Sequence, residues 1–288
     1  MNILISTNKK FLEASRTMLI SLEASNKEEK LNVFLFYSEL NKNDILRLSS
    51  VIVKHGNTFH PILVDDSCFA GIPINLLSKE TYYRLLAVKL LPDRIDKILY
   101  LDSDMVITGK LNELYETDLN GYFYAAAPDT SNGVNDLCML LHIPSKYTYI
   151  NAGVLLMNLA ELRKEFNLEE ALDFAKKNPH LVPNCDQDVI NGLYYDKIKI
   201  IDGKYDYEAR FHSFLEVITY PFEWIKNKKN KNIVIVHYMG KDKPWHKGYW
   251  GKYGFEFYKN ARYTFFNKYS FYNLVTWPFY IFKILTSK

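Results

Sequence analysis

The first hundred residues alternate short apolar segments with longer amphipathic ones, and this alternation limits the possible folds most strongly. Phe11, Met18 and Leu22 follow helical spacing, with charged residues between them. Strands are predicted at 2–6, 32–37, 60–64 and 98–101, and helices at 10–25, 44–54 and 79–91. Because strands that alternate with helices form parallel sheets with right-handed crossovers, we predict an α/β fold with a mostly parallel, Rossmann-like sheet flanked by helices.

The pattern is less regular beyond residue 101. It predicts strands at 122–127, 151–158 and 232–238, a helix at 161–177 and another helix that begins near Asp186. No internal repeat, low-complexity segment or linker interrupts the sequence. We therefore predict one catalytic domain, residues 1–250, followed by a helical and aromatic C-terminal appendage, residues 251–288.

The strand at 98–101 runs directly into Asp102, Ser103 and Asp104. Residues i and i+2 of an extended segment project to the same side, so the two carboxylates converge. They repel each other unless a cation lies between them, and hard oxygen ligands suit Mg²⁺ or Mn²⁺. The alternative is a polar turn in which Asp104 or Thr108 caps the next element. Ligands of open parallel sheets bind at the carboxyl ends of the strands, which is where this pair is expected.

A second polar cluster follows the last predicted strand. His237 lies at the end of that strand, where a neutral imidazole could complete the coordination begun by the aspartates. Lys243 could reach a phosphate as a point charge, and Gly240 would let the backbone approach that phosphate closely. The alternative is that His237 merely ends a strand and that Lys243 is a solvated loop lysine.

Several classes of protein are excluded by the sequence. It contains no GxGxxG fingerprint, no P-loop and no nucleic-acid-binding motif. The net charge of +3 conceals an excess of +6 in residues 247–288, so the remainder is slightly acidic and does not resemble a nucleic-acid binder. Cys68, Cys138 and Cys185 lack zinc-ligand spacing and are expected to be free, buried thiols in a reducing compartment.

The C-terminal segment is both basic and aromatic. Its apolar run at 274–285 contains Thr276, Pro278 and Lys283 and is too short to span a bilayer, which takes about 20 apolar residues. Aromatic rings beside lysines suit the membrane interface. The alternative is that these rings pack on the domain itself. Because the N-terminus shows no signal-peptide pattern, we expect a cytoplasmic protein, peripheral on the inner face of the cell membrane.

Five motifs together resemble glycosyltransferase family 8, the retaining nucleotide-sugar transferases that include lipopolysaccharide galactosyl- and glucosyltransferases. The motifs follow the family's order over residues 1 to 250, and they are Tyr83-Arg84-Leu85, Leu99 to Asp104, Asn151-Ala152-Gly153-Val154, Asp186-Gln187-Asp188 with Asn191-Gly192-Leu193, and His237-Tyr238 through Lys243-Pro244-Trp245. The resemblance implies a GT-A type fold and transfer of galactose or glucose from a UDP-sugar to a glycan or glycolipid acceptor.

The resemblance also implies roles for single residues. Asp102, Asp104 and His237 would hold Mn²⁺, or alternatively Mg²⁺, against the UDP diphosphate. The residues implied to contact the nucleotide are Ser6, Asn8, Phe11, Ser103, Gly240 and Lys243. The residues implied to surround the donor sugar are Arg84, Asp129, Asn151, Asp186 and Gln187. The family commonly has an acidic residue where Asn8 stands, and Phe11 is the candidate for stacking on the uracil.

Some alternatives remain open at the level of the sequence. Arg84 could instead pair with a core acid, and the triplet 186–188 could be only a helix N-terminus. The same residue types would allow a UDP-sugar hydrolase that uses water as acceptor. A non-catalytic, membrane-attached module that binds nucleotide sugars is the alternative from another class. Because an amide oxygen is a poor nucleophile, Gln187 favours front-face attack over a covalent intermediate.

Overall fold

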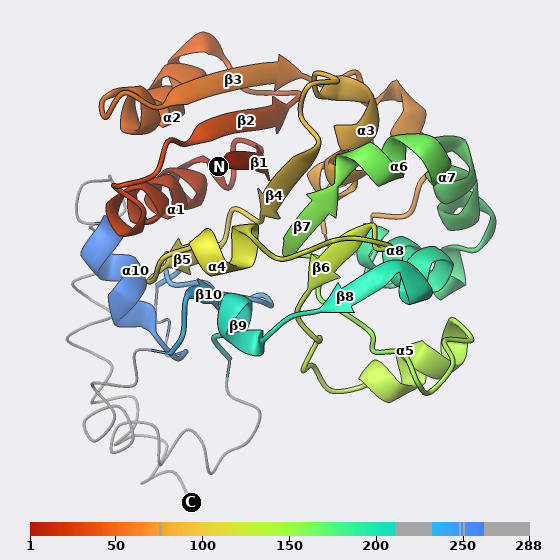
Figure 1. Cartoon of the computed structure of the whole chain (residues 1–288). Helices are drawn as coiled ribbons and strands as arrows, with labels where there is room; N and C mark the ends of the chain where they lie inside the picture. The colour runs from red at the N-terminus through yellow and green to blue at the C-terminus, as the bar shows by residue number, and fades with distance from the viewer. Residues whose placement is uncertain (75–76, 211–231, 248, 250, 262–288) are drawn as a thin grey trace, which may run out of the picture.

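The computed structural model describes residues 1–74, 77–210, 232–247, 249 and 251–261, and its main feature is a seven-stranded sheet (Figure 1). The strand order is β3-β2-β1-β4-β7-β6-β8. These strands are β1 (Asn2–Ser6), β2 (Asn32–Tyr37), β3 (Thr58–Leu63), β4 (Lys97–Leu101), β6 (Tyr124–Ala126), β7 (Val154–Asn158) and β8 (Ile198–Ile200).

The sheet is parallel except at one strand. β1 pairs in parallel with both β2 and β4, whereas β7 runs antiparallel to β4 and to β6. The pairing of Ile5 with Leu101 aligns the ends of β1 and β4, so the loops that follow these two strands lie side by side. The predicted α/β class and its mostly parallel sheet are confirmed.

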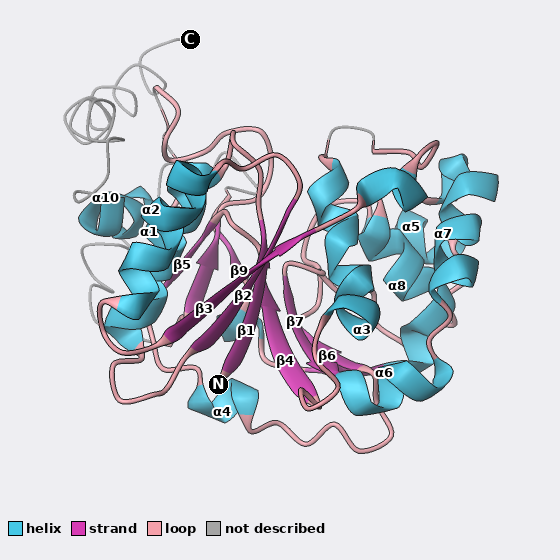
Figure 2. Cartoon of the chain, turned by 90° about the horizontal axis from the view of Figure 1, so that it is seen from above, coloured by secondary structure: helices cyan, strands magenta, loops and turns pink. Residues whose placement is uncertain are grey.

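Helices cover both faces of the sheet (Figure 2). Ile3 and Ile5 of β1 point into the core formed with α1 (Leu12–Ser25) and α2 (Lys42–Val53). Leu4 points into the opposite core, as expected from the two-residue period of a strand. That core is closed by the helices η2 (Lys79–Leu86), α3 (Ala87–Leu90), α6 (Leu159–Glu165), α7 (Leu168–Lys177) and α8 (Asp186–Tyr194).

A second sheet of three strands lies beyond the carboxyl end of β4. Its order is β5 (Met105–Ile107), β10 (Ile235–His237) and β9 (Tyr207–Glu208). β10 runs antiparallel to β5 and parallel to β9. Since β5 begins directly after the aspartate pair, this small sheet brings the end of β10 next to that pair. The remaining short helices are α4 (Asn112–Tyr115), α5 (Val134–Leu140), η1 (Asp66–Phe69), η3 (Pro179–Leu181), η4 (Tyr195–Lys197) and η5 (Gly203–Tyr205).

Two predicted helices differ from the observed ones. The segment predicted as one helix at 161–177 is broken between α6 and α7, because Phe166 is extended and the Asn167 side chain caps the new helix by accepting a hydrogen bond from the Glu170 amide. The segment predicted as a helix at 79–91 is mostly a 3₁₀ helix, and only its last turn is α-helical.

The prediction of buried thiols was wrong for Cys68 and Cys138, which are partly exposed, whereas Cys185 is buried; all three are free.

The beginning of the predicted appendage packs on the domain. In α10 (Gly254–Ala261), Phe257 and Tyr258 join a buried cluster with Trp245, and α10 lies against α1. The boundary at residue 250 and the membrane-interface segment at 274–285 remain predictions, and residues 262–288 lie outside the described part of the chain. Among the described residues, no helix has both the length and the apolar character needed to cross a membrane.

Candidate active site

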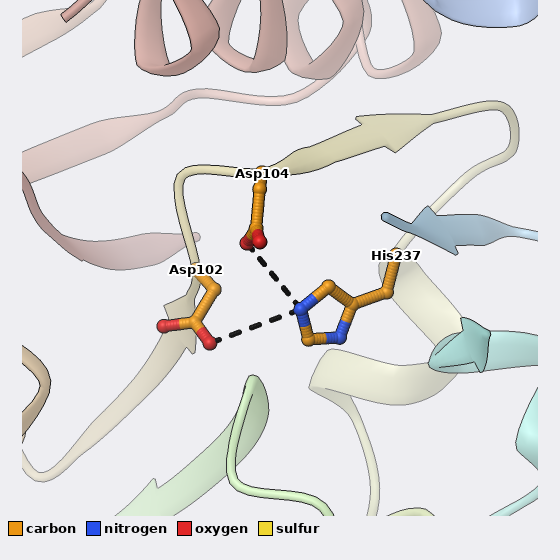
Figure 3. A group of neighbouring side chains, drawn as sticks. All are labelled: Asp102, Asp104 and His237. Carbon is orange, nitrogen blue, oxygen red and sulfur yellow. Dashed lines mark ion pairs between the residues drawn. The ribbon is translucent and has the colours of Figure 1, made fainter. Parts of the chain in front are cut away.

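The loop between β4 and β5 directs two carboxylates to one side. The Ser103 side chain turns inward, where its hydroxyl donates to the Ser6 carbonyl oxygen at 2.8 Å and accepts from the Ser15 hydroxyl at 2.9 Å. With Ser103 fixed in this way, Asp102 and Asp104 face the neighbouring end of β10 (Figure 3). Their side chains keep 23% and 14% of their surface exposed, so a ligand from solvent can reach them.

His237 completes this group. Pairing of β10 with β5 sets His237 opposite Met105, and the imidazole Nε2 lies 3.3 Å from Asp104 Oδ1 and 3.9 Å from Asp102 Oδ2. One ligand atom from each of Asp102, Asp104 and His237 lies within 4.8 Å of the others. Two carboxylate oxygens and one imidazole nitrogen form a donor set that fits Mn²⁺ or Mg²⁺ and leaves coordination positions for phosphate oxygens.

Each aspartate in the group divides its two oxygens between partners. Asp102 Oδ1 accepts hydrogen bonds from the Tyr100 hydroxyl at 2.6 Å and from Arg84 at 3.1 Å, which leaves Oδ2 on the His237 side. Asp104 Oδ2 pairs with Lys243 at 2.6 Å, which leaves Oδ1 on the His237 side. Both free oxygens therefore converge toward the same imidazole.

Lys243 is buried rather than solvated. Only 8% of the residue is exposed, and its ammonium also donates to the Tyr238 carbonyl oxygen at 2.5 Å. The alternative of a solvated loop lysine is therefore wrong. Burial would raise the pKa of Asp104, but the charges of Lys243 and His237 hold it well below its usual range. Gly240 has φ of +84°, a left-handed conformation that glycine adopts without strain.

The other imidazole nitrogen contacts a residue that the sequence did not reveal. Nδ1 of His237 lies 2.8 Å from Oδ1 of Asp206, whose side chain is fully buried. Burial would lower the pKa of His237, but the carboxylates of Asp206 and Asp104 raise it to about 10. Asp206 belongs to no motif, and the pairing of β9 with β10 brings it close to His237.

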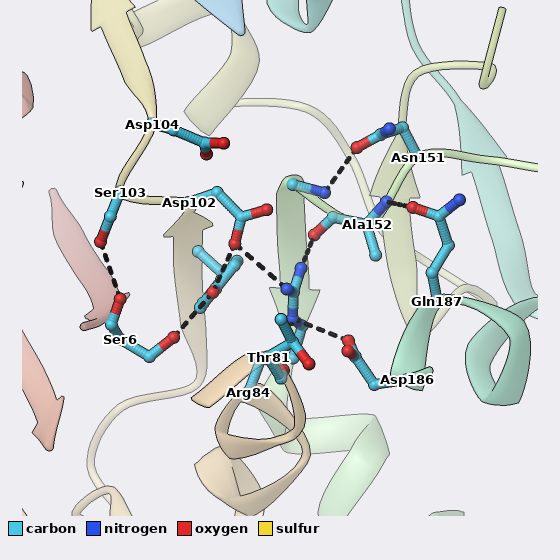
Figure 4. A network of polar contacts seen from close by, with 12 residues as sticks. Ser6, Thr81, Arg84, Asp102, Ser103, Asp104, Asn151, Ala152, Asp186 and Gln187 are labelled. Atoms are coloured by element: carbon cyan, nitrogen blue, oxygen red, sulfur yellow. Dashed lines mark hydrogen bonds and ion pairs between the residues drawn. The ribbon is translucent and has the colours of Figure 1, made fainter. Parts of the chain in front are cut away.

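Arg84 connects the aspartate pair with the first residue of α8 (Figure 4). Its guanidinium pairs with Asp102 Oδ1 at 3.1 Å and Asp186 Oδ2 at 2.9 Å, donates to the Ala152 carbonyl oxygen, and lies over the Tyr100 ring at 4.2 Å. Burial raises the pKa of the Asp186 carboxyl to about 6, although the Arg84 charge lowers it. Pairing with a core acid, left open by the sequence, is therefore confirmed for Arg84 through the buried Asp186.

Gln187 is held by several hydrogen bonds at the start of α8. Its side-chain nitrogen donates to Asp129 Oδ2 at 2.8 Å and to the Tyr149 hydroxyl at 3.1 Å, and its oxygen accepts from the Ala152 amide at 3.0 Å. Asp188 accepts from the Tyr149 hydroxyl at 2.5 Å and from the backbone just before the helix, which makes it an anchor of the helix start.

Asn151 lies beside this group at the start of the turn into β7. Its Oδ1 accepts the Gly153 amide at 2.8 Å, and its side-chain nitrogen lies 3.2 Å from the Met239 sulfur. Asn151 thus connects the Gln187 side of the site with the loop after β10. Arg84 pairs with Asp186, Gln187 bonds to Asp129, and both Arg84 and Gln187 bond to Ala152, the residue after Asn151, so the residues predicted for the donor sugar lie in one connected group.

The loop after β1 contains the residues predicted to face the base. Asn8 Oδ1 accepts the backbone amides of Lys10 and Phe11 at 2.9 and 3.2 Å, and its side-chain nitrogen donates to Glu80 Oε2 at 3.0 Å. Phe11 lies edge-to-face against Trp245 with ring centroids 5.9 Å apart. Glu80, which belongs to none of the sequence motifs, thus supplies a carboxylate beside the Asn8 side-chain amide.

Solved structures share this fold. The crystal structure of the galactosyltransferase LgtC in complex with donor and acceptor sugar analogs aligns with a TM-score of 0.78 at 22% identity, covering 92% of this chain and 96% of that one. At this identity the likeness shows the fold alone. The fold is the GT-A fold of glycosyltransferases, as the resemblance implied.

Sequence comparison gives the family. The profile described as "Glycosyl transferase family 8" matches residues 2–248, and the chain belongs to this family. Lipopolysaccharide 1,2-glucosyltransferase of Escherichia coli is 28% identical over 242 residues, which are 82% of this chain and 69% of that protein. Lipopolysaccharide 1,3-galactosyltransferase of Salmonella typhimurium is 25% identical over 259 residues, which are 88% of this chain and 74% of that protein.

Replacing Arg84 tests whether it holds these acids together. We expect Arg84→Met to lower the free energy of unfolding by about 3–5 kcal/mol, because Asp102 and Asp186 lose a buried partner. Urea unfolding followed by circular dichroism measures the change. Arg94 is exposed, and Arg94→Met serves as the matched control, expected within about 0.5 kcal/mol of wild type. A loss below about 1 kcal/mol for Arg84→Met, the range of a surface ion pair, would contradict this role.

Proposed function

We propose that the protein is a Mn²⁺-dependent, retaining hexosyltransferase that moves galactose or glucose from a UDP-sugar to a glycan or glycolipid acceptor. The observation that carries this proposal is the convergence of Asp102, Asp104 and His237 on one point, with Lys243 beside them. Family membership supports the glycosyl transfer. The names of the two lipopolysaccharide transferases support a hexose as the transferred sugar.

Breaking the sugar–phosphate bond places negative charge on the UDP leaving group and positive charge on the sugar. A divalent cation held by Asp102, Asp104 and His237 would stabilise the charge on the diphosphate. Lys243 lies against Asp104, within the same group, and would exchange this ion pair for one with a phosphate oxygen. Gly240, three residues earlier, would present its backbone to the same phosphates.

The sugar would lie between Arg84, Asp186 and Gln187, with Asp129 and Asn151 at its edge. Gln187 offers an amide rather than a carboxylate, and its oxygen already accepts the Ala152 amide. Retention of configuration then follows from front-face attack, in which the departing phosphate accepts the proton of the acceptor hydroxyl. Gln187 would orient the sugar and stabilise its positive charge through the dipole of its amide.

The nucleoside would lie over the loop after β1. Ser6 and Ser103 fix the backbone there through their mutual hydrogen bond, and Ser103 also sets the turn between the two aspartates. Asn8 would contact the uracil or its ribose, and Phe11 would stack on the base. The Glu80 carboxylate lies next to Asn8, the residue that stands where the family commonly has an acid, and would accept a hydrogen bond from the nucleoside beside it.

Release of UDP tests the proposed reaction. With UDP-glucose, UDP-galactose and UDP-N-acetylglucosamine as donors, we expect one of the two hexoses to give UDP release that depends on Mn²⁺ and stops with EDTA. Asp104→Asn should lower the rate about 10²–10³-fold, because it weakens stabilisation of the leaving group. The exposed Asp93 provides the control Asp93→Asn, expected to be unchanged. The metal role would be refuted if UDP release did not require Mn²⁺ or if Asp104→Asn kept full activity. The protein would be a hydrolase if free sugar and UDP formed in equal amounts with an acceptor present.

The mechanism is tested at Gln187. We expect Gln187→Ala to lower kcat about 10²-fold while KM for the donor changes little, because the amide acts mainly on the developing charge. Asn120→Ala, at an exposed turn, is the control. Mass spectrometry of the wild-type protein mixed with donor alone should detect no sugar adduct. A trapped adduct would establish double displacement instead of front-face attack.

We also propose peripheral contact with the inner face of the cell membrane, near a glycolipid acceptor. The basic, aromatic C-terminal segment supports this contact. We expect the full chain to co-sediment with vesicles of phosphatidylglycerol and phosphatidylethanolamine but not with phosphatidylcholine vesicles. Removal of residues 262–288 should abolish the co-sedimentation. Equal binding by the shortened chain would contradict a membrane role for this segment.

A further inference from the structure

We propose that Asp206 is a positioning residue that holds His237 as a metal ligand, with Nε2 toward the aspartate pair. This inference rests on the proposed metal site formed by Asp102, Asp104 and His237. It assigns a role to a residue outside every motif of the sequence.

Asp206 lies on a segment whose backbone is fixed. Its amide donates to the Gly203 carbonyl oxygen at 3.2 Å, and the next residues form β9, which pairs with β10. Directly after β9, the Ala209 amide donates to the carbonyl oxygen of His237 itself at 2.8 Å. The Asp206 side chain therefore approaches His237 from the residue just before β9, a strand that pairs with the strand of His237.

The hydrogen bond from Asp206 selects one orientation of the imidazole. Asp206 Oδ1 lies 2.8 Å from Nδ1, whereas Nε2 lies 3.3 Å from Asp104 Oδ1. A carboxylate accepts hydrogen bonds, so it keeps a proton on Nδ1 and makes Nε2 the ring nitrogen that would bind a cation. A carboxylate partner on the other ring nitrogen also makes a histidine a stronger metal ligand.

Gly153 restrains the ring from another side. A Cβ atom at this position would lie 2.4 Å from Cε1 and 2.9 Å from Nδ1 of His237, so the ring packs directly against the Gly153 backbone. That backbone is itself fixed, because the Gly153 carbonyl oxygen accepts the Asp102 amide at 2.9 Å. Asp206 fixes the Nδ1 edge of the ring, and Gly153, which has no Cβ atom, leaves room for the ring in this orientation.

The Asp206 carboxylate forms few hydrogen bonds other than the one with His237. Its side chain is fully buried, and among the described residues its only side-chain hydrogen bond is to His237, while Oδ2 has no hydrogen-bond partner. Burying a carboxylate in this way is costly, and an acid that served only the fold would gain more from backbone amides. The arrangement is explained if the carboxylate serves the imidazole.

Binding of Mn²⁺ in the presence of UDP provides the test, measured by the electron paramagnetic resonance signal of free Mn²⁺. We expect Asp206→Ala to raise the dissociation constant about 10–100-fold, the range for loss of such an outer partner. Asp206→Asn should have a smaller effect in the same direction, because its amide oxygen can still accept from Nδ1. Asp202→Asn, at an exposed acid on the same segment, should bind Mn²⁺ as wild type does.

A second readout follows the imidazole itself. Long-range ¹H–¹⁵N spectra of the wild-type protein with Mg²⁺ and UDP should show the His237 proton on Nδ1, and Asp206→Asn should show a mixture of tautomers. If Asp206→Ala does not fold, Asp206→Asn decides through both readouts. The proposal is overturned if Asp206→Asn keeps the Mn²⁺ affinity and the His237 tautomer of the wild type and only has a lower melting temperature.

A comparison with Asp104→Asn separates this proposal from the proposed metal site. If Asp104→Asn loses Mn²⁺ binding while the Asp206 variants keep it, the metal site stands and the role of Asp206 is refuted. If Asp104→Asn also binds Mn²⁺ as wild type does, the metal site itself is wrong, and the proposal for Asp206 fails with it.

Discussion

Two carboxylates that converge at the end of β4 need positive charge around them, and the active-site region is arranged to provide it. Arg84 pairs with Asp102, Lys243 pairs with Asp104, and His237 lies between the two free oxygens. These partners come from η2, from the loop after β10 and from β10 itself. The electrostatic requirement of the pair therefore links segments that are more than a hundred residues apart.

The proposed metal site and the residues proposed to surround the donor sugar belong to one polar network. Arg84 contacts Asp102 on one side and Asp186 on the other, and its third contact, the Ala152 carbonyl oxygen, belongs to the residue whose amide binds Gln187. A shift of the aspartate pair would therefore move Asp186 and Gln187, which we propose to contact the donor sugar. Such rigidity suits a reaction whose rate depends on preorganised charges.

Much of this arrangement could be predicted from the sequence, because the strands alternate with helices and the polar motifs follow strand ends. The direction of β7 could not be predicted, since a buried strand has the same apolar pattern in either direction. The break at Asn167 depends on a single capping side chain. Asp206 and Glu80 were missed because each gains its role from a partner distant in the sequence, His237 and Asn8.

The most direct test of the account is the position of the cation itself. Crystals grown with Mn²⁺ and UDP, measured at a wavelength where manganese scatters anomalously, should give one strong anomalous peak about 2.0–2.4 Å from oxygens of Asp102 and Asp104 and from His237 Nε2. The UDP diphosphate should occupy the remaining coordination positions, with Lys243 turned from Asp104 to a phosphate oxygen. A diphosphate bound in this region with no anomalous peak at the three residues would contradict the central claim.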